Sequence, residues 1–272
     1  MTSTLQLERH FSGPELELAR AAAAGKREEI ARLVRAGADP NAISPGGLPL
    51  IAWPILQDNV DGVAALLDNG ADANRPVPAA GTAMVWAVKA ADPRILEAFL
   101  AHGGDADARS QDREPLTRVA ALAGRWAHVQ RLIAHGAAVD AAAQDDAGDT
   151  LLAYYSAGQF DKAHWLLDRG ADPAHRIAKS AVPQRIGAQP IVENIYWWPV
   201  QAGRFPELAQ WQRRCQDLLA ARGFAAPVEP AHLARLRASQ HGSGHADDAK
   251  EHNLDAEIRQ SEAAIQQEQR KH

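Results

Sequence analysis

Five glycines recur at almost constant spacing along the first two thirds of this 272-residue chain. Consecutive members are separated by 33, 33, 33 and 34 residues, and each follows a short apolar stretch. They are Gly37, Gly70, Gly103, Gly136 and Gly170. A fixed period of this length is typical of a solenoid, in which helix pairs stack and each repeat packs only on its neighbours. The chain is therefore predicted to grow in one dimension instead of closing around one globular core.

The positions seven, four and three residues before each glycine are apolar in all five copies. These spacings place side chains on one face of a helix, so each copy is predicted to bury that face. The members are Ile30, Leu33 and Val34; Val63, Leu66 and Leu67; Leu96, Phe99 and Leu100; Val129, Leu132 and Ile133; and Ala163, Leu166 and Leu167. The glycine then ends the helix in the left-handed conformation, which costs other residues about 1 kcal/mol.

The residue two positions after the glycine is an aspartate in four copies, and Asp side chains accept backbone amide hydrogens in turns. Asp39, Asp72, Asp105 and Asp172 are expected to fix their turns in this way, whereas Ala138 cannot. A second, shorter helix is predicted upstream of each glycine-ended helix. Turn residues introduce it, Thr or Asp is expected to cap it, and small residues that allow close helix approach follow. The small residues are Ala87, Ala120, Ala121 and Ala153.

These motifs resemble those of the ankyrin-repeat family over about residues 12 to 175. The turn after each long helix is represented by Leu67-Asp-Asn-Gly-Ala-Asp-Ala-Asn74, and Gly25, Gly124 and Gly158 occupy the glycine position between the two helices. The segments that introduce the short helices match only in part, as in Glu114-Pro-Leu-Thr117. The resemblance implies an all-α solenoid of stacked helix-turn-helix units joined by short hairpin-like loops.

The predicted organisation has three parts. Residues 1–11 form an N-terminal extension, residues 12–226 the repeat domain, and residues 227–272 a polar tail that is disordered or a frayed helix. The charged first copy is expected to act as the N-terminal cap. The repeat domain ends in an atypical sixth repeat over residues 176–226, which contains an insertion and closes near Gly223. Its paired leucines, Leu218 and Leu219, lie one residue out of register with those of the other repeats. The position of Pro54 in its helix depends on whether the repeat is aligned on Gly70 or on Leu48. Aligned on Gly70, Pro54 lies in the first turn, where proline does not disrupt a helix, and we favour this alignment.

An aromatic run lies in the insertion, and two interpretations of it stay open. Tyr196, Trp197 and Trp198 either cover the open end of the stack or anchor a partner protein, because Trp and Tyr dominate interface energetics. The only cysteine, Cys215, is predicted to be a buried structural thiol.

Composition excludes several function classes. The net charge is −5 with both signs interspersed, so neither nucleic acid nor an anionic membrane is an expected partner. The N-terminus lacks the features of a secretory signal, so we expect a cytoplasmic protein. The chain has 23 arginines against 6 lysines, which suits a GC-rich bacterial genome.

The sequence offers no catalytic constellation, and we predict that the protein is not an enzyme and needs no cofactor or metal. Phosphate-binding and nucleophile-elbow motifs are absent from the sequence. The tail histidines can bind metal in principle but have no rigid frame around them, so a zinc enzyme is the least favoured alternative. They are His232, His241, His245 and His252.

The favoured function is a non-enzymatic scaffold that binds one partner protein through its loop tips and inner helices, as the resemblance implies. The tips are predicted at residues 41–47, 74–81, 107–114 and 140–149. Candidate contacts are Arg75, Arg109, Asp112, Arg113, Asp145, Asp146, Tyr196, Trp197 and Trp198. We expect a monomer.

The resemblance also implies two finer roles. Small bacterial ankyrin-repeat proteins include immunity proteins that block a cognate toxin or effector. The alternative is a regulatory or effector adaptor that docks on a signalling or cytoskeletal protein.

Overall fold

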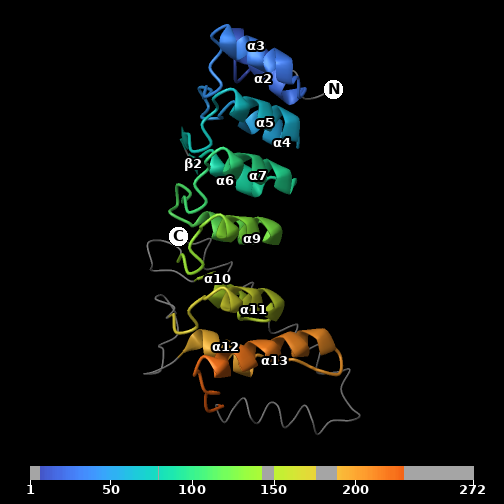
Figure 1. Ribbon diagram of the computed structural model, residues 1–272, viewed down its shortest axis with the longest axis vertical. Coiled ribbons are helices and arrows are strands. Elements are labelled where there is room, and N and C mark those ends of the chain that lie inside the picture. The colour runs from blue at the N-terminus through green and yellow to red at the C-terminus, as the bar shows by residue number, and fades with distance from the viewer. Residues whose placement is uncertain (1–6, 79, 143–149, 176–188, 230–272) are drawn as a thin grey trace, which may run out of the picture. The chain divides into compact units, whose positions relative to one another are not determined.

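The computed structural model describes residues 7–78, 80–142, 150–175 and 189–229. Contacts divide the chain into two units, Met1–Pro227 and Val228–His272, and all the described helices belong to the first. Within this unit the helices pair in chain order, and the pairs stack on one another (Figure 1). The predicted ankyrin-like solenoid is confirmed. From residue 230 on, the predicted tail with its histidines lies outside the described residues.

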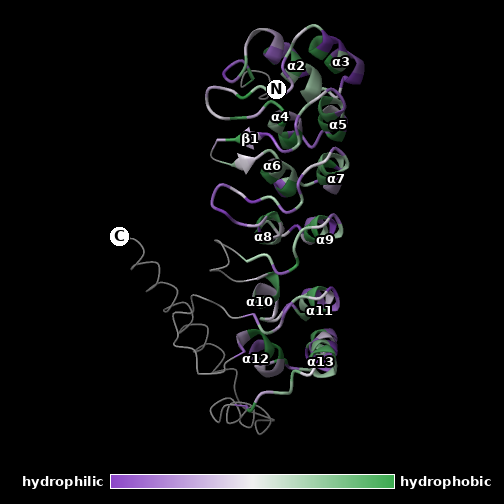
Figure 2. Cartoon of the chain, turned by 60° about the vertical axis from the view of Figure 1, so that its left-hand side comes forward, coloured by the Kyte–Doolittle hydropathy of each residue, from purple (hydrophilic) through white to green (hydrophobic). Residues whose placement is uncertain are grey.

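The helices form two columns (Figure 2). The inner column comprises α2 (Gly13–Ala23), α4 (Ala52–Leu56), α6 (Met84–Lys89), α8 (Leu116–Leu122), α10 (Leu151–Tyr155) and α12 (Pro190–Trp197). The outer column comprises α3 (Arg27–Arg35), α5 (Val60–Asp68), α7 (Pro93–Ala101), α9 (Trp126–Ala134), α11 (Phe160–Asp168) and α13 (Pro206–Ala221). The connecting loops project beyond the inner column on one side, so the tips and the inner helices share one face of the stack.

The glycines end the outer helices as predicted. Gly37, Gly70, Gly103, Gly136 and Gly170 have φ angles of 103°, 93°, 79°, 99° and 93°, all in the left-handed region that suits glycine. Two residues later, each of the four aspartates accepts an amide hydrogen within its own turn; the Asn41 N to Asp39 Oδ1 distance, for example, is 2.8 Å. Ala138 has no side-chain acceptor, and within its turn Ala141 N donates to the Ala138 carbonyl oxygen at 3.2 Å.

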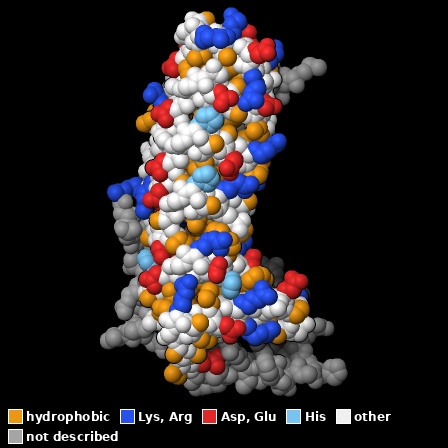
Figure 3. Space-filling view, in the orientation of Figure 1, with side chains coloured by type: hydrophobic (Ala, Val, Ile, Leu, Met, Phe, Trp, Pro, Cys, Tyr) orange, Lys and Arg blue, Asp and Glu red, His pale blue; other side chains and the backbone are white. Residues whose placement is uncertain are grey.

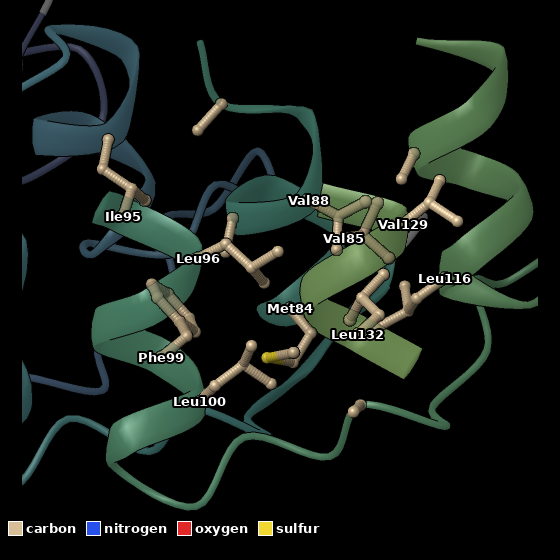
Figure 4. Packing of buried hydrophobic residues seen from close by; sticks show 14 of the residues in the cluster. Met84, Val85, Val88, Ile95, Leu96, Phe99, Leu100, Leu116, Val129 and Leu132 are labelled. Atoms are coloured by element: carbon tan, nitrogen blue, oxygen red, sulfur yellow. The ribbon is translucent and has the colours of Figure 1, made fainter. Parts of the chain in front are cut away.

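The predicted apolar faces form the core. In the central repeats all of these side chains except the partly buried Ile133 are buried between successive helix pairs, as Figure 4 shows for Leu96, Phe99, Val129 and Leu132. Leu33 and Val34 are only partly buried, because α3 belongs to the first repeat and has a neighbour on one side only. Pro54 lies in the first turn of α4 and is buried, which confirms the register counted from Gly70.

Neighbouring loops are joined by a ladder of side-chain hydrogen bonds. Asn41 donates to the Gly70 carbonyl oxygen at 2.9 Å and accepts from Asp72 N at 2.7 Å. Asn74 makes the same pair of bonds to the next repeat. Asp107 and Asp140 occupy the next two rungs and accept the amide hydrogens of Ala138 and Asp172. An ionised carboxylate has no hydrogen to donate, so each of these rungs lacks the bond to the glycine carbonyl.

Of the two ends of the repeat unit, the N-terminal one differs from the sequence-based expectation. Leu7 and Phe11, assigned to an extension outside the repeats, are 3% and 6% exposed and belong to the same hydrophobic core. In α13, Leu219 is buried four residues before Gly223, Leu218 is partly buried one residue earlier, and Ala220 is exposed. Cys215 is fully buried, as predicted. Burial raises its thiol pKa to about 12, with a smaller contribution from Asp161.

Candidate partner-binding surface

The loop tips form one wall of the candidate surface, and they hold one another in place. The second tip is a short antiparallel hairpin, with β1 (Pro76–Val77) paired to β2 (Gly81–Thr82), and single bridges close the first and third tips. Gln111 N in the third tip donates to the carbonyl oxygen of Ala80 in the second at 3.2 Å. A Cβ atom on Gly81 would lie 2.7 Å from Gln111 N, so this close contact between the tips requires glycine.

A pocket of about 550 Å³ lies where these two tips meet the inner helices α6 and α8. Its lining residues are Ala80, Val85, Trp86, Lys89, Ser110, Gln111, Asp112, Glu114, Val119, Leu122 and Ala123. The two helices supply mainly apolar side chains, and Leu122 is 59% exposed. A pocket of this volume with apolar walls and a few polar groups has the usual character of a ligand site.

Charged side chains stand at both ends of this pocket. At the tip end, Glu114 forms an ion pair with Arg118, with 2.9 Å between Oε2 and Nε, and Asp112 is exposed. At the other end, the exposed Lys89 is the last residue of α6. Within the described residues neither Asp112 nor Lys89 has an ion-pair partner, so both charges are available to a ligand.

Two further inner helices expose large apolar side chains. Leu56 at the end of α4 is 59% exposed, and Tyr154 in α10 is 40% exposed. Leu56 and Leu122 lie at the same repeat position, fourteen residues before Gly70 and Gly136, and Lys89 holds this position before Gly103. The inner column therefore carries exposed apolar groups on both sides of the pocket along the stack.

The predicted tip residues have different environments. Asp112 lines the pocket, and Arg75 is exposed in the second tip. Arg109 is engaged within the fold: its Nη1 donates to the carbonyl oxygens of Arg113 and Ala142, each at 2.9 Å. Arg113 itself is exposed and has a φ of 61°, a left-handed conformation that is uncommon for arginine. Asp145 and Asp146 lie outside the described residues.

The aromatic run lies in the sixth repeat, away from the pocket-lining residues. The Tyr196 hydroxyl donates to the Gln216 carbonyl oxygen of α13 at 3.3 Å, and burial raises its pKa. Trp198 is 39% exposed and packs beside Gly158, where an added Cβ would meet its Nε1 at 3.1 Å. Trp197 is partly buried in the last turn of α12. The run thus forms part of the last described helix pair, while leaving some aromatic surface exposed.

Sequence reasoning missed the residues that make most of the pocket. Trp86, Lys89 and Leu122 were not among the predicted site residues, because they lie on the short helices and not in the loop tips. One signal was present in the sequence: Leu56 and Leu122 share a repeat position beyond the buried small residues of the short helix.

Other surface features bear on the kind of partner. On the face seen in Figure 3, acidic and basic side chains are interspersed. Among the described residues, His, Cys, Asp and Glu form no group of three that could hold a metal ion. In this described part of the chain, no helix has the length and apolar character needed to cross a membrane.

Comparison with known proteins agrees with this architecture. The family model "Ankyrin repeats (3 copies)" matches residues 84–177, which contain α6 to α11. No curated protein matches the sequence. Among solved structures, the chain is similar to the ankyrin repeat domain of Bcl-3, described as a unique member of the IkappaB protein family. The match has 20% sequence identity and a TM-score of 0.56, and it covers 75% of this chain and 97% of that domain.

The repeat period, the paired helices and the family match all lead to one assignment. Ankyrin repeats generally mediate protein–protein interactions, and domains built from them are typically non-catalytic. Residues 84–177 match ankyrin repeats, and the paired helices stack in the ankyrin-repeat fold.

Proposed function

We propose that this protein is a non-enzymatic scaffold that binds one partner protein through the face shared by the loop tips and the inner helices. The observation that carries the proposal is the pocket between α6 and α8, with Leu122 exposed beside Trp86. Large apolar side chains gathered in a concave, partly enclosed surface are the usual anchors of a protein interface.

Capture of the partner from native extract with the full chain as bait tests this proposal. Leu122→Asp places a charge on the apolar floor, and because Leu122 is more than half exposed the fold should tolerate the change. We expect the variant to lose one stoichiometric protein that the wild type retains. The lost affinity should be at least about tenfold, which is roughly 1.4 kcal/mol.

A matched control is available on the outer column. Ala127 is exposed in the first turn of α9, where an acidic side chain suits the helix N-terminus. Ala127→Glu adds the same charge as Leu122→Asp without touching the pocket. Equal capture by all three proteins would reject the proposed face, and loss of the partner in both variants would point to a general effect of charge.

For the partner itself, we propose a toxin or effector whose action the scaffold blocks, so that the protein works as an immunity protein. The support is the pocket between α6 and α8 and the exposed apolar side chains beside it on a repeat scaffold. Co-expression provides the test: the wild type should protect cells from the captured partner, and Leu122→Asp should not. A captured partner that is harmless when expressed alone would refute this finer role and favour a regulatory adaptor.

A further inference from the structure

We propose that the pocket between α6 and α8 is an anchor site for a short peptide segment with a large apolar side chain between two opposite charges. The cation of the segment would face Asp112 at the tip end, and its carboxylate would face Lys89 at the far end. This inference rests on the proposed function and specifies what the partner must present.

The apolar part of the segment follows from the pocket walls. Val85 and Trp86 come from α6, and Val119, Leu122 and Ala123 come from α8, so two neighbouring repeats contribute to one apolar floor. Leu122 is 59% exposed, and covering such a side chain stabilises a complex by removing apolar surface from water. A volume of about 550 Å³ accommodates a tryptophan-sized group with its adjoining backbone.

The charged part follows from the two unpaired groups. Glu114 is already neutralised by Arg118 at 2.9 Å, so the exposed carboxylate at the tip end is that of Asp112. Lys89 is the cation at the opposite end, because α6 begins at Met84, directly after the second tip, and ends at Lys89. Opposite charges at the two ends favour one orientation of a bipolar peptide and disfavour the reverse.

The dimensions suit a very short segment. Lys89 lies three residues beyond Trp86 on α6, or about 4.5 Å along the helix at 1.5 Å per residue. Neighbouring residues of an extended chain are about 3.3 Å apart. A charged residue next to the apolar one therefore reaches Lys89 when the segment runs parallel to the inner helices, and the residue on its other side lies towards the tip that carries Asp112.

Capped tripeptides test this site on the full chain without knowledge of the partner. The probes are acetyl-Lys-Trp-Glu-amide and acetyl-Glu-Trp-Lys-amide, which cover both chain directions, and acetyl-Lys-Ala-Glu-amide as the apolar control. Nuclear magnetic resonance of the isotope-labelled protein reports binding. The indole N–H of Trp86 is a local reporter, since it is buried and has no hydrogen-bond partner in the described residues.

We expect one tryptophan probe to shift the Trp86 indole and the pocket amides, and to bind at least about tenfold more tightly than the alanine probe. Lys89→Glu should weaken that probe, and acetyl-Lys-Trp-Lys-amide should recover binding to the variant. Ala127→Glu should bind all probes as the wild type does. Equal binding of the tryptophan and alanine probes, or no shift up to about 10 mM, would overturn the anchor site.

The two proposals fail in different ways. If Leu122→Asp loses the captured partner while no probe binds, the face shared by the loop tips and the inner helices is the interface, but this pocket is not its peptide anchor. If the partner is captured equally by Leu122→Asp, the proposed function fails, and the anchor site fails with it as a partner site.

Discussion

The buried imidazole of His128 donates its Nδ1 hydrogen to the carbonyl oxygen of Val88, at a distance of 2.8 Å. His128 belongs to α9, and Val88 lies near the end of α6, in the preceding repeat. The bond thus satisfies an inner-helix carbonyl group from the next outer helix. Burial lowers the pKa of His128, a change that the bond to Val88 opposes and that Arg131 and Arg125 reinforce.

A lowered histidine pKa makes stability depend on pH in a defined direction. The folded state favours the neutral ring of His128. Its contribution to the unfolding free energy is therefore fully present above the pKa of about 6.5 in the unfolded chain, and it declines as the pH falls through the lower pKa of the folded state. His128→Asn keeps a donor but does not titrate. Urea unfolding at pH 7.5 and pH 5 should show a smaller loss of unfolding free energy in the variant; an equal loss would assign the pH dependence to other groups.

Asp140 offers a stabilising substitution. Burial raises the pKa of Asp140, although the hydrogen bond from the Asp172 amide opposes this change. The ionised carboxylate therefore reduces the stability of the folded protein at neutral pH. This loss of stability becomes smaller as the pH falls through the raised pKa. Asp140→Asn removes the charge and supplies the donor that Asn41 and Asn74 use in their rungs. We expect a gain of about 0.5–1.5 kcal/mol in unfolding free energy at pH 7. A variant less stable than the wild type would contradict this account of the ladder.

Gly62 should resist replacement even by alanine. It lies inside α5, where alanine is normally favoured by about 1 kcal/mol over glycine. Here an added Cβ would lie 2.0 Å from the carbonyl oxygen of Ala22, so the two helices must separate. Gly62→Ala is expected to cost about 3 kcal/mol by thermal or urea unfolding. Gly46→Ala, whose Cβ would meet only Ser44 at 3.8 Å, serves as the tolerant control.

Leu132 and Leu122 allow a comparison of buried and exposed leucines in one repeat. Leu132 is fully buried and Leu122 is 59% exposed. Leu132→Ala should lower the unfolding free energy by about 2–5 kcal/mol, and Leu122→Ala by less than about 1 kcal/mol. Urea titration of the two variants measures both values. Similar costs at the two positions would mean that the apolar face of α9 is wrongly assigned.

Cys215 should not react with thiol reagents while the protein is folded. Its thiol is fully buried and has a pKa of about 12, so almost none of the reactive thiolate exists at pH 8. A thiol reagent should label the native chain only at the rate of unfolding, and label one equivalent promptly in urea. Prompt labelling of the native protein would show that α13 opens readily.

The sequence predicted the parts of this fold that depend on local chemistry. Gly103 ends its helix, and Leu96 and Phe99 point into the core, because periodicity and backbone conformation are set within a few residues. The burial of Leu7 and Phe11 was missed, since two apolar residues among polar ones do not show what they pack against.

The candidate site was less predictable because it depends on contacts between repeats. Arg109 has the sequence context of an exposed loop residue, and only its bond to the Ala142 carbonyl oxygen, 33 residues away, shows that it supports the fold. The pocket likewise forms from α6, α8 and two tips that meet only in three dimensions.

The unequal rungs of the ladder give the stack a mechanical polarity. Asn41 and Asn74 each tie two loops by a donated and an accepted bond, whereas Asp107 and Asp140 only accept. At the joint of Asp107, Arg109 adds a donated bond to the Ala142 carbonyl oxygen, so among the described rungs that of Asp140 should open first under tension along the stack. We therefore expect bending of the stack to fit a partner to be greatest at the joint between the fourth and fifth repeats.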